Sequence, residues 1–229
     1  MCTERWIIEK KNTNRVFFLS IFLFFLRIIS NALHCRSFQE AKTVRDSNYP
    51  DVKLALSDYS IEFWNSWSNK TGRNWDLVKD LKERDCGIDQ VNLVLYLHKG
   101  VTQFEEIRET IRAYESIGVS VGLVEFDVRC NDYSFDCEVS GDEAWSDEML
   151  EAQAEVYGQV VKVCLEEPNC VEISFNELAD GWSGSQRLPP QNACLFDKDF
   201  QAKPAFDRVV QELAGFDRNH AAVQARFGN

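Results

Sequence analysis

Short apolar runs alternate with amphipathic segments four times along this chain of 229 residues. The run NLVLYL at 92–97 is apolar almost throughout, which is typical of a strand buried on both faces. The segment at 104–117 instead repeats Ile and Tyr at the spacing of one helical face. Strands are expected at residues 52–56 and 92–97, within 121–130 and at 171–175, and helices at 75–84, 104–117, 147–166 and 203–213.

This order of elements predicts an α/β fold with a parallel sheet. Parallel strands need long crossovers, which are almost always right-handed and are usually helical. Four strand–helix units make half of an eight-fold barrel. A doubly wound sheet is the alternative, although no Gly-rich phosphate turn opens any of the expected helices. Periodicity alone leaves both architectures open.

The stretch VGLVEFDVRC at 121–130 carries the strongest functional signal. It places Glu125 where the expected strand ends, and a second acid follows at Asp127. A carboxylate is costly to bury and useful for chemistry at the C-terminal end of a barrel strand. Glu125 is therefore the candidate nucleophile.

The formal charge of −12 limits the kinds of partner that the chain can bind. Phosphate backbones and anionic membrane surfaces are bound by Lys and Arg, so the charge argues against nucleic acid and against such membranes. A neutral or cationic partner is expected instead.

Eight cysteines favour an oxidising compartment. Cys130 with Cys137, and Cys164 with Cys170, are spaced to close small disulfide loops. Neither a CxxC pair nor a His ligand spacing is present, so no metal site is expected.

The N-terminus has the layout of a signal peptide. Basic residues precede the apolar run VFFLSIFLFFL at 16–26, and small residues permit cleavage after Ala32. The run is too short to span a bilayer comfortably, so no stable membrane span is expected. A secreted protein is the prediction, and a signal anchor is the alternative.

Five segments together resemble the C-terminal half of glycoside hydrolase family 10, the retaining endo-1,4-β-xylanases. The likeness covers about residues 38–213, in the order of the family. The resemblance implies a partial TIM (β/α)8 barrel, strands five to eight with their helices. It divides the chain into a leader at 1–36, a half-barrel at 37–216 and a tail at 217–229. The matching segments are KLALSDYSIE at 53–62, LVKDLKERDCGIDQVNLVLYLH at 77–98, VGLVEFDVRC at 121–130, EMLEAQAEVYGQVVKVCLEEPNCVEISF at 148–175, and GWSG with NACLFDKDFQAKPAFDRVVQEL within 181–213.

The resemblance also implies a mechanism and roles for single residues. Glu125 matches the nucleophile of the family motif, and Asp127 would orient it. Tyr59, Tyr96 and Trp182 would line a sugar cleft. The implied substrate is a neutral polysaccharide such as xylan, and no cofactor is implied.

Several positions depart from the family pattern. Val94 and Tyr96 stand where the family has Gln and His, and that His bridges the nucleophile and the Asp. His98 replaces it only if the strand shifts by two residues. The family's acid/base segment, Trp-Asp-Val-Val-Asn-Glu, has no counterpart in the matched region. Asn176-Glu177 resembles its end, but these residues follow the last strand and the likeness is interpreted as coincidence.

Three hypotheses remain open from the sequence. The first is an incomplete copy of a xylanase-type hydrolase, with activity near background on xylan. The second is a secreted carbohydrate-binding relative that has lost catalysis. The third is a signal-anchored interaction protein built on a half-barrel. Because its sheet edges are open, a half-barrel is expected to associate with another half, to bind a partner or to remain poorly folded.

Overall fold

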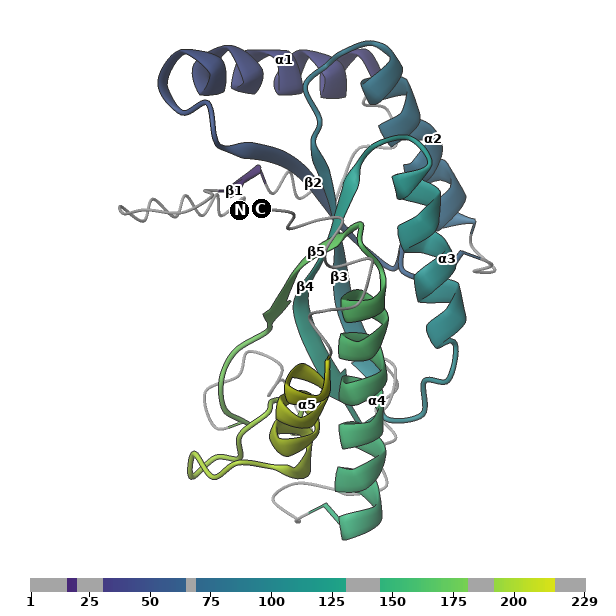
Figure 1. Cartoon of the computed structure of the whole chain (residues 1–229), viewed down its shortest axis with the longest axis vertical. Helices are drawn as coiled ribbons and strands as arrows, with labels where there is room; N and C mark the ends of the chain where they lie inside the picture. The colour runs from purple at the N-terminus through teal and green to yellow at the C-terminus, as the bar shows by residue number, and fades with distance from the viewer. Residues whose placement is uncertain (1–15, 20–30, 65–68, 131–144, 181–191, 217–229) are drawn as a thin grey trace.

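The protein is described by a computed structural model that places residues 16–19, 31–64, 69–130, 145–180 and 192–216. Strands and helices alternate along the chain (Figure 1). The strands are β1 (Val16–Leu19), β2 (Lys53–Tyr59), β3 (Gln90–His98), β4 (Ser120–Arg129) and β5 (Cys170–Phe175), and the helices are α1 (Asn31–Asn48), α2 (Lys70–Glu83), α3 (Phe104–Glu115), α4 (Asp147–Glu166) and α5 (Pro204–Gly215).

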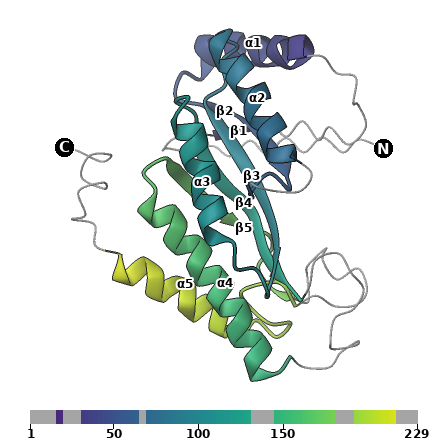
Figure 2. The same ribbon diagram turned by 90° about the vertical axis from the view of Figure 1, so that its right-hand side faces the viewer.

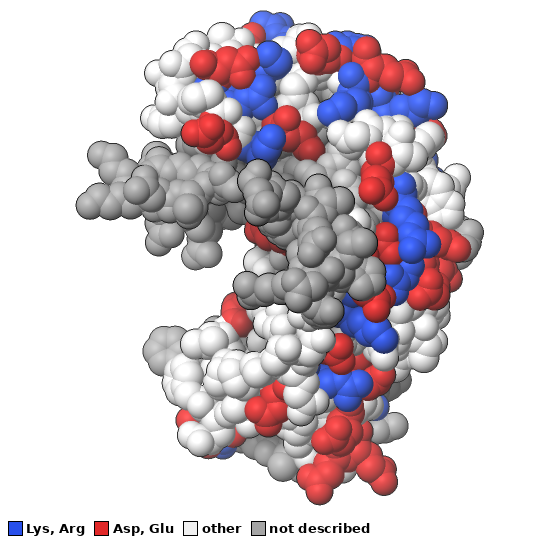
Figure 3. Space-filling view, in the orientation of Figure 1, with Lys and Arg blue, Asp and Glu red and all other residues white. Residues whose placement is uncertain are grey.

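The strands form one parallel sheet in the order β1-β2-β3-β4-β5. The helices lie along one side of this sheet (Figures 1 and 2). This arrangement confirms the α/β fold with parallel strands that the sequence predicts. In the space-filling view, charged side chains of both signs mix along the helical side (Figure 3).

The two faces of the sheet differ in chemistry because side chains alternate along each strand. Along β3, the odd-numbered residues from Val91 to Leu97 are almost fully buried in the core beneath the helices. The even-numbered residues Gln90, Asn92 and Tyr96 belong to the other face. In a complete barrel this second face would be the interior.

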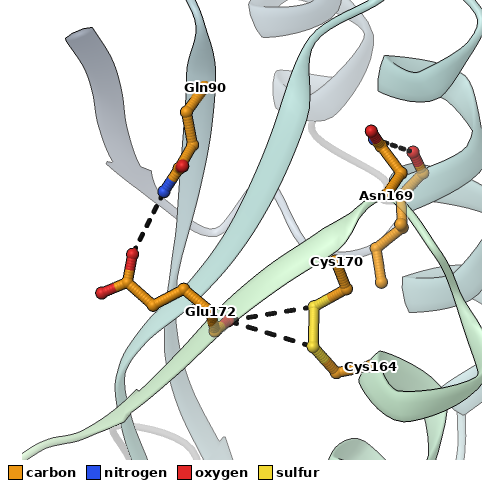
Figure 4. Close-up of a disulfide and its surroundings, with 6 residues drawn as sticks. Gln90, Cys164, Asn169, Cys170 and Glu172 are labelled. Atoms are coloured by element: carbon orange, nitrogen blue, oxygen red, sulfur yellow. Dashed lines mark hydrogen bonds between the residues drawn. A yellow bond between two sulfur atoms is a disulfide. The ribbon is translucent and has the colours of Figure 1, made fainter. Parts of the chain in front are cut away.

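A layer of hydrogen-bonded polar side chains crosses that inner face near the start of the strands. Gln90 Nε2 donates to Asn92 Oδ1 at 2.8 Å. The same nitrogen donates to Glu172 Oε2 at 3.2 Å (Figure 4). Asn92 Nδ2 donates to Ser57 Oγ at 3.1 Å. The layer thus links β2, β3 and β5, and it passes over Gly122 of β4.

Gly122→Ala is expected to destabilise the fold by about 1–3 kcal/mol, because overpacking a full core forces its neighbours to move. An added Cβ would lie 2.6 Å from Asn92 Oδ1 and 2.8 Å from Gln90 Nε2, and both of these side chains are buried. Gly215→Ala is the control, since nothing lies within 4 Å of its Cβ position. Urea unfolding midpoints measure both variants. Equal midpoints for the two would contradict the close approach at Gly122.

Disulfides tie the helices to the sheet. The bond between Cys164 and Cys170 confirms the predicted pair and closes the turn from α4 to β5 (Figure 4). A bond between Cys35 and Cys86, which the sequence pattern did not predict, joins α1 to the segment before β3. Cys130 is also disulfide-bonded, whereas its predicted partner Cys137 lies outside the described residues.

The N-terminal segment contributes two elements that the sequence pattern did not predict. β1 lies within the apolar run at 16–26 and pairs with β2 in parallel register, from Val16 opposite Lys53 to Leu19 opposite Leu56. Helix α1 spans the predicted cleavage site after Ala32 and the predicted boundary between residues 36 and 37. That boundary stays a prediction, and the tail at 217–229 lies outside the described residues. None of the helices in the described ranges has the length and apolar content needed to cross a bilayer.

Candidate active site

Glu125 occupies a β-bulge near the C-terminal end of β4. Val124 of β4 lies opposite Val94 of β3, but the next pair is Asp127 with Tyr96, so β4 has one extra residue. The pairing of β4 with β5 slips at the same place, between Leu123 and Phe126. The φ angle of Glu125 is 49°, in the left-handed region that residues other than glycine rarely adopt. Such backbone costs about 1–3 kcal/mol and is concentrated at functional sites.

The bulge determines which way Glu125 points. Val121 and Leu123 pack in the core beneath the helices, so a regular strand would send residue 125 to the same side. The extra residue shifts the phase, and Phe126 then takes the core position, 4.7 Å from the ring of Tyr157. Glu125 is left on the inner face and is partly exposed. The bulge therefore combines a buried aromatic ring with an accessible carboxylate.

Tyr96 of β3 contacts Glu125 directly. Its hydroxyl donates a hydrogen bond to Glu125 Oε2. Burial raises the pKa of Tyr96 well above its usual value, and the hydrogen bond to Glu125 and the negative charge of that residue raise it further. The phenol therefore remains a neutral donor throughout the physiological pH range.

Asp127 is buried beside Glu125 and has three donors. Arg129 binds both of its oxygens, through Nε at 2.9 Å and Nη2 at 3.0 Å. Asn176, which follows β5, donates from Nδ2 to Oδ2 at 2.9 Å. Burial raises the pKa of Asp127, and the hydrogen bonds from Arg129 and Asn176 oppose this effect.

Arg129 also joins Asp127 to Tyr96. Its guanidinium carbon lies 4.5 Å from the centroid of the Tyr96 ring, within the range of a cation–π contact. A continuous series of contacts therefore runs across three strand ends. We call it the Glu125 cluster, and its members are Glu125, Tyr96, Arg129, Asp127 and Asn176.

The other predicted site residues lie apart from this cluster or outside the described ranges. Tyr59 ends β2, pairs with Val94 and is 37% exposed, with Lys70 Nζ 3.7 Å from its ring centroid. His98 accepts a hydrogen bond from the backbone of Gly100 at 3.2 Å, and Tyr96 rather than His98 contacts Glu125. Trp182 lies outside the described residues.

Sequence reasoning missed two members of the cluster. Arg129 follows Asp127 by two residues, which puts both on one face of a strand, and this spacing was an available signal. Asn176 comes from the far side of β4, and the likeness of Asn176-Glu177 to the acid/base segment gave no indication of a contact with Asp127. Its contact with Asp127 follows from tertiary structure alone. No three His, Cys, Asp or Glu side chains are grouped for metal binding within the described ranges.

Comparison with known proteins identifies similar sequences and folds. A family model described as glycosyl hydrolase family 10 matches residues 23–212. The chain is 28% identical over 193 residues to endo-1,4-beta-xylanase 1 of Humicola insolens, a match that covers 83% of this chain and 41% of that protein. The endo-1,4-beta-xylanase XylE of Penicillium canescens superposes with a TM-score of 0.69 at 26% identity, over 80% of this chain and 53% of that one.

A second similar structure contains a bound sugar. Xylanase 10B from Thermotoga petrophila, solved in complex with xylobiose, superposes with a TM-score of 0.66 at 23% identity and covers 78% of this chain and 51% of that one. The fold therefore matches part of a TIM barrel. The chain spans about half the length of the relatives that it matches.

Proposed function

Because the chain belongs to glycosyl hydrolase family 10, we propose that it carries the nucleophile half of a retaining endo-1,4-β-xylanase-type active site. The substrate class is a xylan-like β-1,4-linked polysaccharide. Glu125 is the nucleophile. The observation that carries this proposal is the bulge, which turns Glu125 to the inner face at the C-terminal end of β4. Active sites of TIM barrels are built at that end of the strands.

The chemistry of Glu125 follows the retaining double displacement. One carboxylate oxygen forms a bond to the anomeric carbon while the bond from that carbon to the leaving oxygen breaks. Water then attacks the same carbon, and the electron pair of the ester bond returns to Glu125. Asp127 orients the site through Arg129 and Asn176. Tyr59 and Trp182 supply aromatic faces to the sugar rings, an assignment that rests on the family resemblance.

The acid/base residue determines which substrates this chain can process. A xylan leaving group needs a proton from a general acid, whose loss typically costs about 10²–10⁴-fold in rate. The family's acid/base segment has no counterpart in the matched region. A polypeptide made of these 229 residues alone is therefore expected to show background activity on xylan and measurable reaction with a sugar that carries an activated aryl leaving group.

The test is covalent labelling with 2,4-dinitrophenyl 2-deoxy-2-fluoro-β-xylobioside. Its leaving group departs without a proton, and the fluorine slows release of the glycosyl-enzyme. The intact mass is expected to rise by one fluoroxylobiosyl group, and peptide mapping should place the label on Glu125. A folded protein that gains no label, or one labelled at another residue, would refute the proposal.

A second candidate is a secreted carbohydrate-binding relative without catalysis. The departures from the family pattern favour it, because Val94 and Tyr96 stand where the family has Gln and His. Two disulfides in the described residues are compatible with an oxidising, extracellular compartment. Retention on insoluble xylan without any covalent labelling would support this second function over the first.

A further inference from the structure

We infer that Tyr96 is the positioning residue for Glu125 and that Arg129 holds Tyr96 in place. The inference rests on the proposed function, since it assigns a role within the same reaction. In the family pattern a single histidine bridges the nucleophile and the neighbouring aspartate. In this chain two side chains share that role, because Tyr96 binds Glu125 and Arg129 binds Asp127.

The contact with Tyr96 distinguishes the two carboxylate oxygens of Glu125. The Tyr96 hydroxyl donates to Oε2, and the proposal therefore assigns the attack on the anomeric carbon to Oε1. Tyr96 is well placed to fix this choice, because its neighbours Leu95 and Leu97 are buried in the core beneath the helices. Its backbone also lies opposite Asp127 in the sheet. The phenol thus approaches Glu125 from a rigid strand.

Arg129 packs against one face of the Tyr96 ring and limits its movement. Its guanidinium group is fixed by two hydrogen bonds to Asp127, at 2.9 and 3.0 Å, and lies over the ring face. Asn176 in turn fixes Asp127. Because a planar guanidinium group binds a carboxylate at two points and stacks on a ring at the same time, lysine does not replace it. Among the described contacts, the Tyr96 ring therefore packs against Arg129, and its hydroxyl donates to Glu125.

This arrangement affects the two chemical steps unequally. A hydrogen bond to Oε2 is strongest when Glu125 is a free carboxylate and weaker when Oε1 is esterified to the sugar. During release, water bonds to the anomeric carbon, the C1–Oε1 bond breaks and its electrons return to the carboxylate, while the water proton passes to the buffer. Tyr96 stabilises the charge that develops on Glu125 in this step. Without Tyr96, the glycosyl-enzyme is expected to persist.

The pair also removes a titrating group from the site. Histidine changes charge near neutral pH, whereas arginine does not, and the pKa of Tyr96 is raised by burial and by Glu125. The charges of Tyr96 and Arg129 therefore stay constant in the pH range in which a histidine would lose a proton.

Release of the fluoroxylobiosyl label tests the role. Labelled protein is freed of reagent, and loss of the label is followed by intact mass in the unmodified chain and in Tyr96→Phe, Tyr96→His, Arg129→Lys and the exposed control Tyr49→Phe. Tyr96→Phe is expected to release the label about tenfold more slowly, the scale of one hydrogen bond to a charged group. Arg129→Lys is expected to change release in the same direction, and Tyr49→Phe to leave it unchanged.

The pH dependence separates positioning from a merely structural role. Between about pH 5.5 and 8, release from the unmodified chain is expected to vary smoothly, whereas Tyr96→His is expected to restore part of the rate with an added inflection near the histidine pKa. Equal release from Tyr96→Phe and the unmodified chain would overturn the inference while leaving the nucleophile assignment intact.

A second measurement does not depend on turnover. In protein labelled with ¹³Cζ-tyrosine, the Tyr96 resonance, assigned by its loss in Tyr96→Phe, is expected to move in Glu125→Gln while that of Tyr49 does not. An unmoved Tyr96 resonance would contradict the contact itself. If no variant takes the label at all, the proposed function fails, and the positioning role fails with it.

Discussion

Replacing Glu125 with glutamine is expected to slow reaction with an activated aryl xylobioside by on the order of 10⁴-fold or more, the scale on which covalent catalysis depends on its nucleophile. Glutamine keeps the size of the side chain and an acceptor oxygen for Tyr96, but its amide is not a nucleophile. The measurement is release of dinitrophenolate. Glu172→Gln is the matched control, because Glu172 lies on the adjoining strand β5 and bonds to Gln90, at 3.2 Å, rather than to the Glu125 cluster.

Chemical rescue sharpens this test. In Glu125→Gly, azide can enter the space of the missing carboxylate and attack the anomeric carbon. One displacement inverts that carbon, so the expected product is an α-xylobiosyl azide, whereas hydrolysis by two displacements retains the β configuration. A β-azide, or an equal loss of activity in Glu172→Gln, would contradict the assignment of Glu125.

Removing the disulfide between Cys35 and Cys86 is expected to cost about 4 kcal/mol of folding free energy, because a bond between residues far apart restricts the unfolded chain strongly. The bonded residues are 51 positions apart in the sequence. The test replaces both cysteines with alanine and measures unfolding in urea. The variant should also lose the connection between α1 and the start of β3.

The second disulfide provides the comparison for this prediction. Cys164 and Cys170 are only 6 positions apart, so the double alanine variant is expected to lose about 2 kcal/mol by the same loop argument. All four cysteines are buried, and the loss of packing is therefore similar in the two variants. Equal costs would mean that loop length does not determine the difference.

The parallel sheet could be predicted from the sequence because its signals are local. The near-continuous apolar run of β3, which is buried on both faces, and the single apolar stripe of α3 are visible within a few residues. The choice of a partial barrel over a doubly wound sheet came from the family resemblance, and the comparisons confirm it. Periodicity cannot distinguish a partial barrel from a doubly wound sheet, since both architectures bury the same kinds of strand and helix.

The candidate site could be predicted only in part. The residue type and strand position of Glu125 are visible in the sequence, but its orientation depends on the bulge. The signal for the bulge is the change of phase from Val121 and Leu123 to Phe126, which sets two apolar positions three residues apart. The bond from Tyr96 to Glu125 depends on the register between β3 and β4, which no single segment encodes.

The two N-terminal elements were missed for different reasons. β1 has the composition of a signal-peptide core, so the residues alone do not distinguish a signal peptide from a β-strand. α1 is a mainly polar helix that inserts only a few side chains into the core, among them Cys35 and Phe38. Its amphipathic pattern is correspondingly weak, and its place is fixed by the disulfide to Cys86.

Because β1 pairs with β2, the residues Val16–Leu19 can serve either as part of a signal peptide or as the fifth strand of the sheet, but not as both. A peptidase that cuts after Ala32 would discard Val16–Leu19 and strip the backbone of Lys53–Leu56 of its neighbour. The mature product would then begin within α1, and β2 would become an edge strand with unpaired backbone groups, to which another strand could pair. Whether a cell retains or removes those residues thus decides whether β1 or β2 is the edge strand on that side of the sheet.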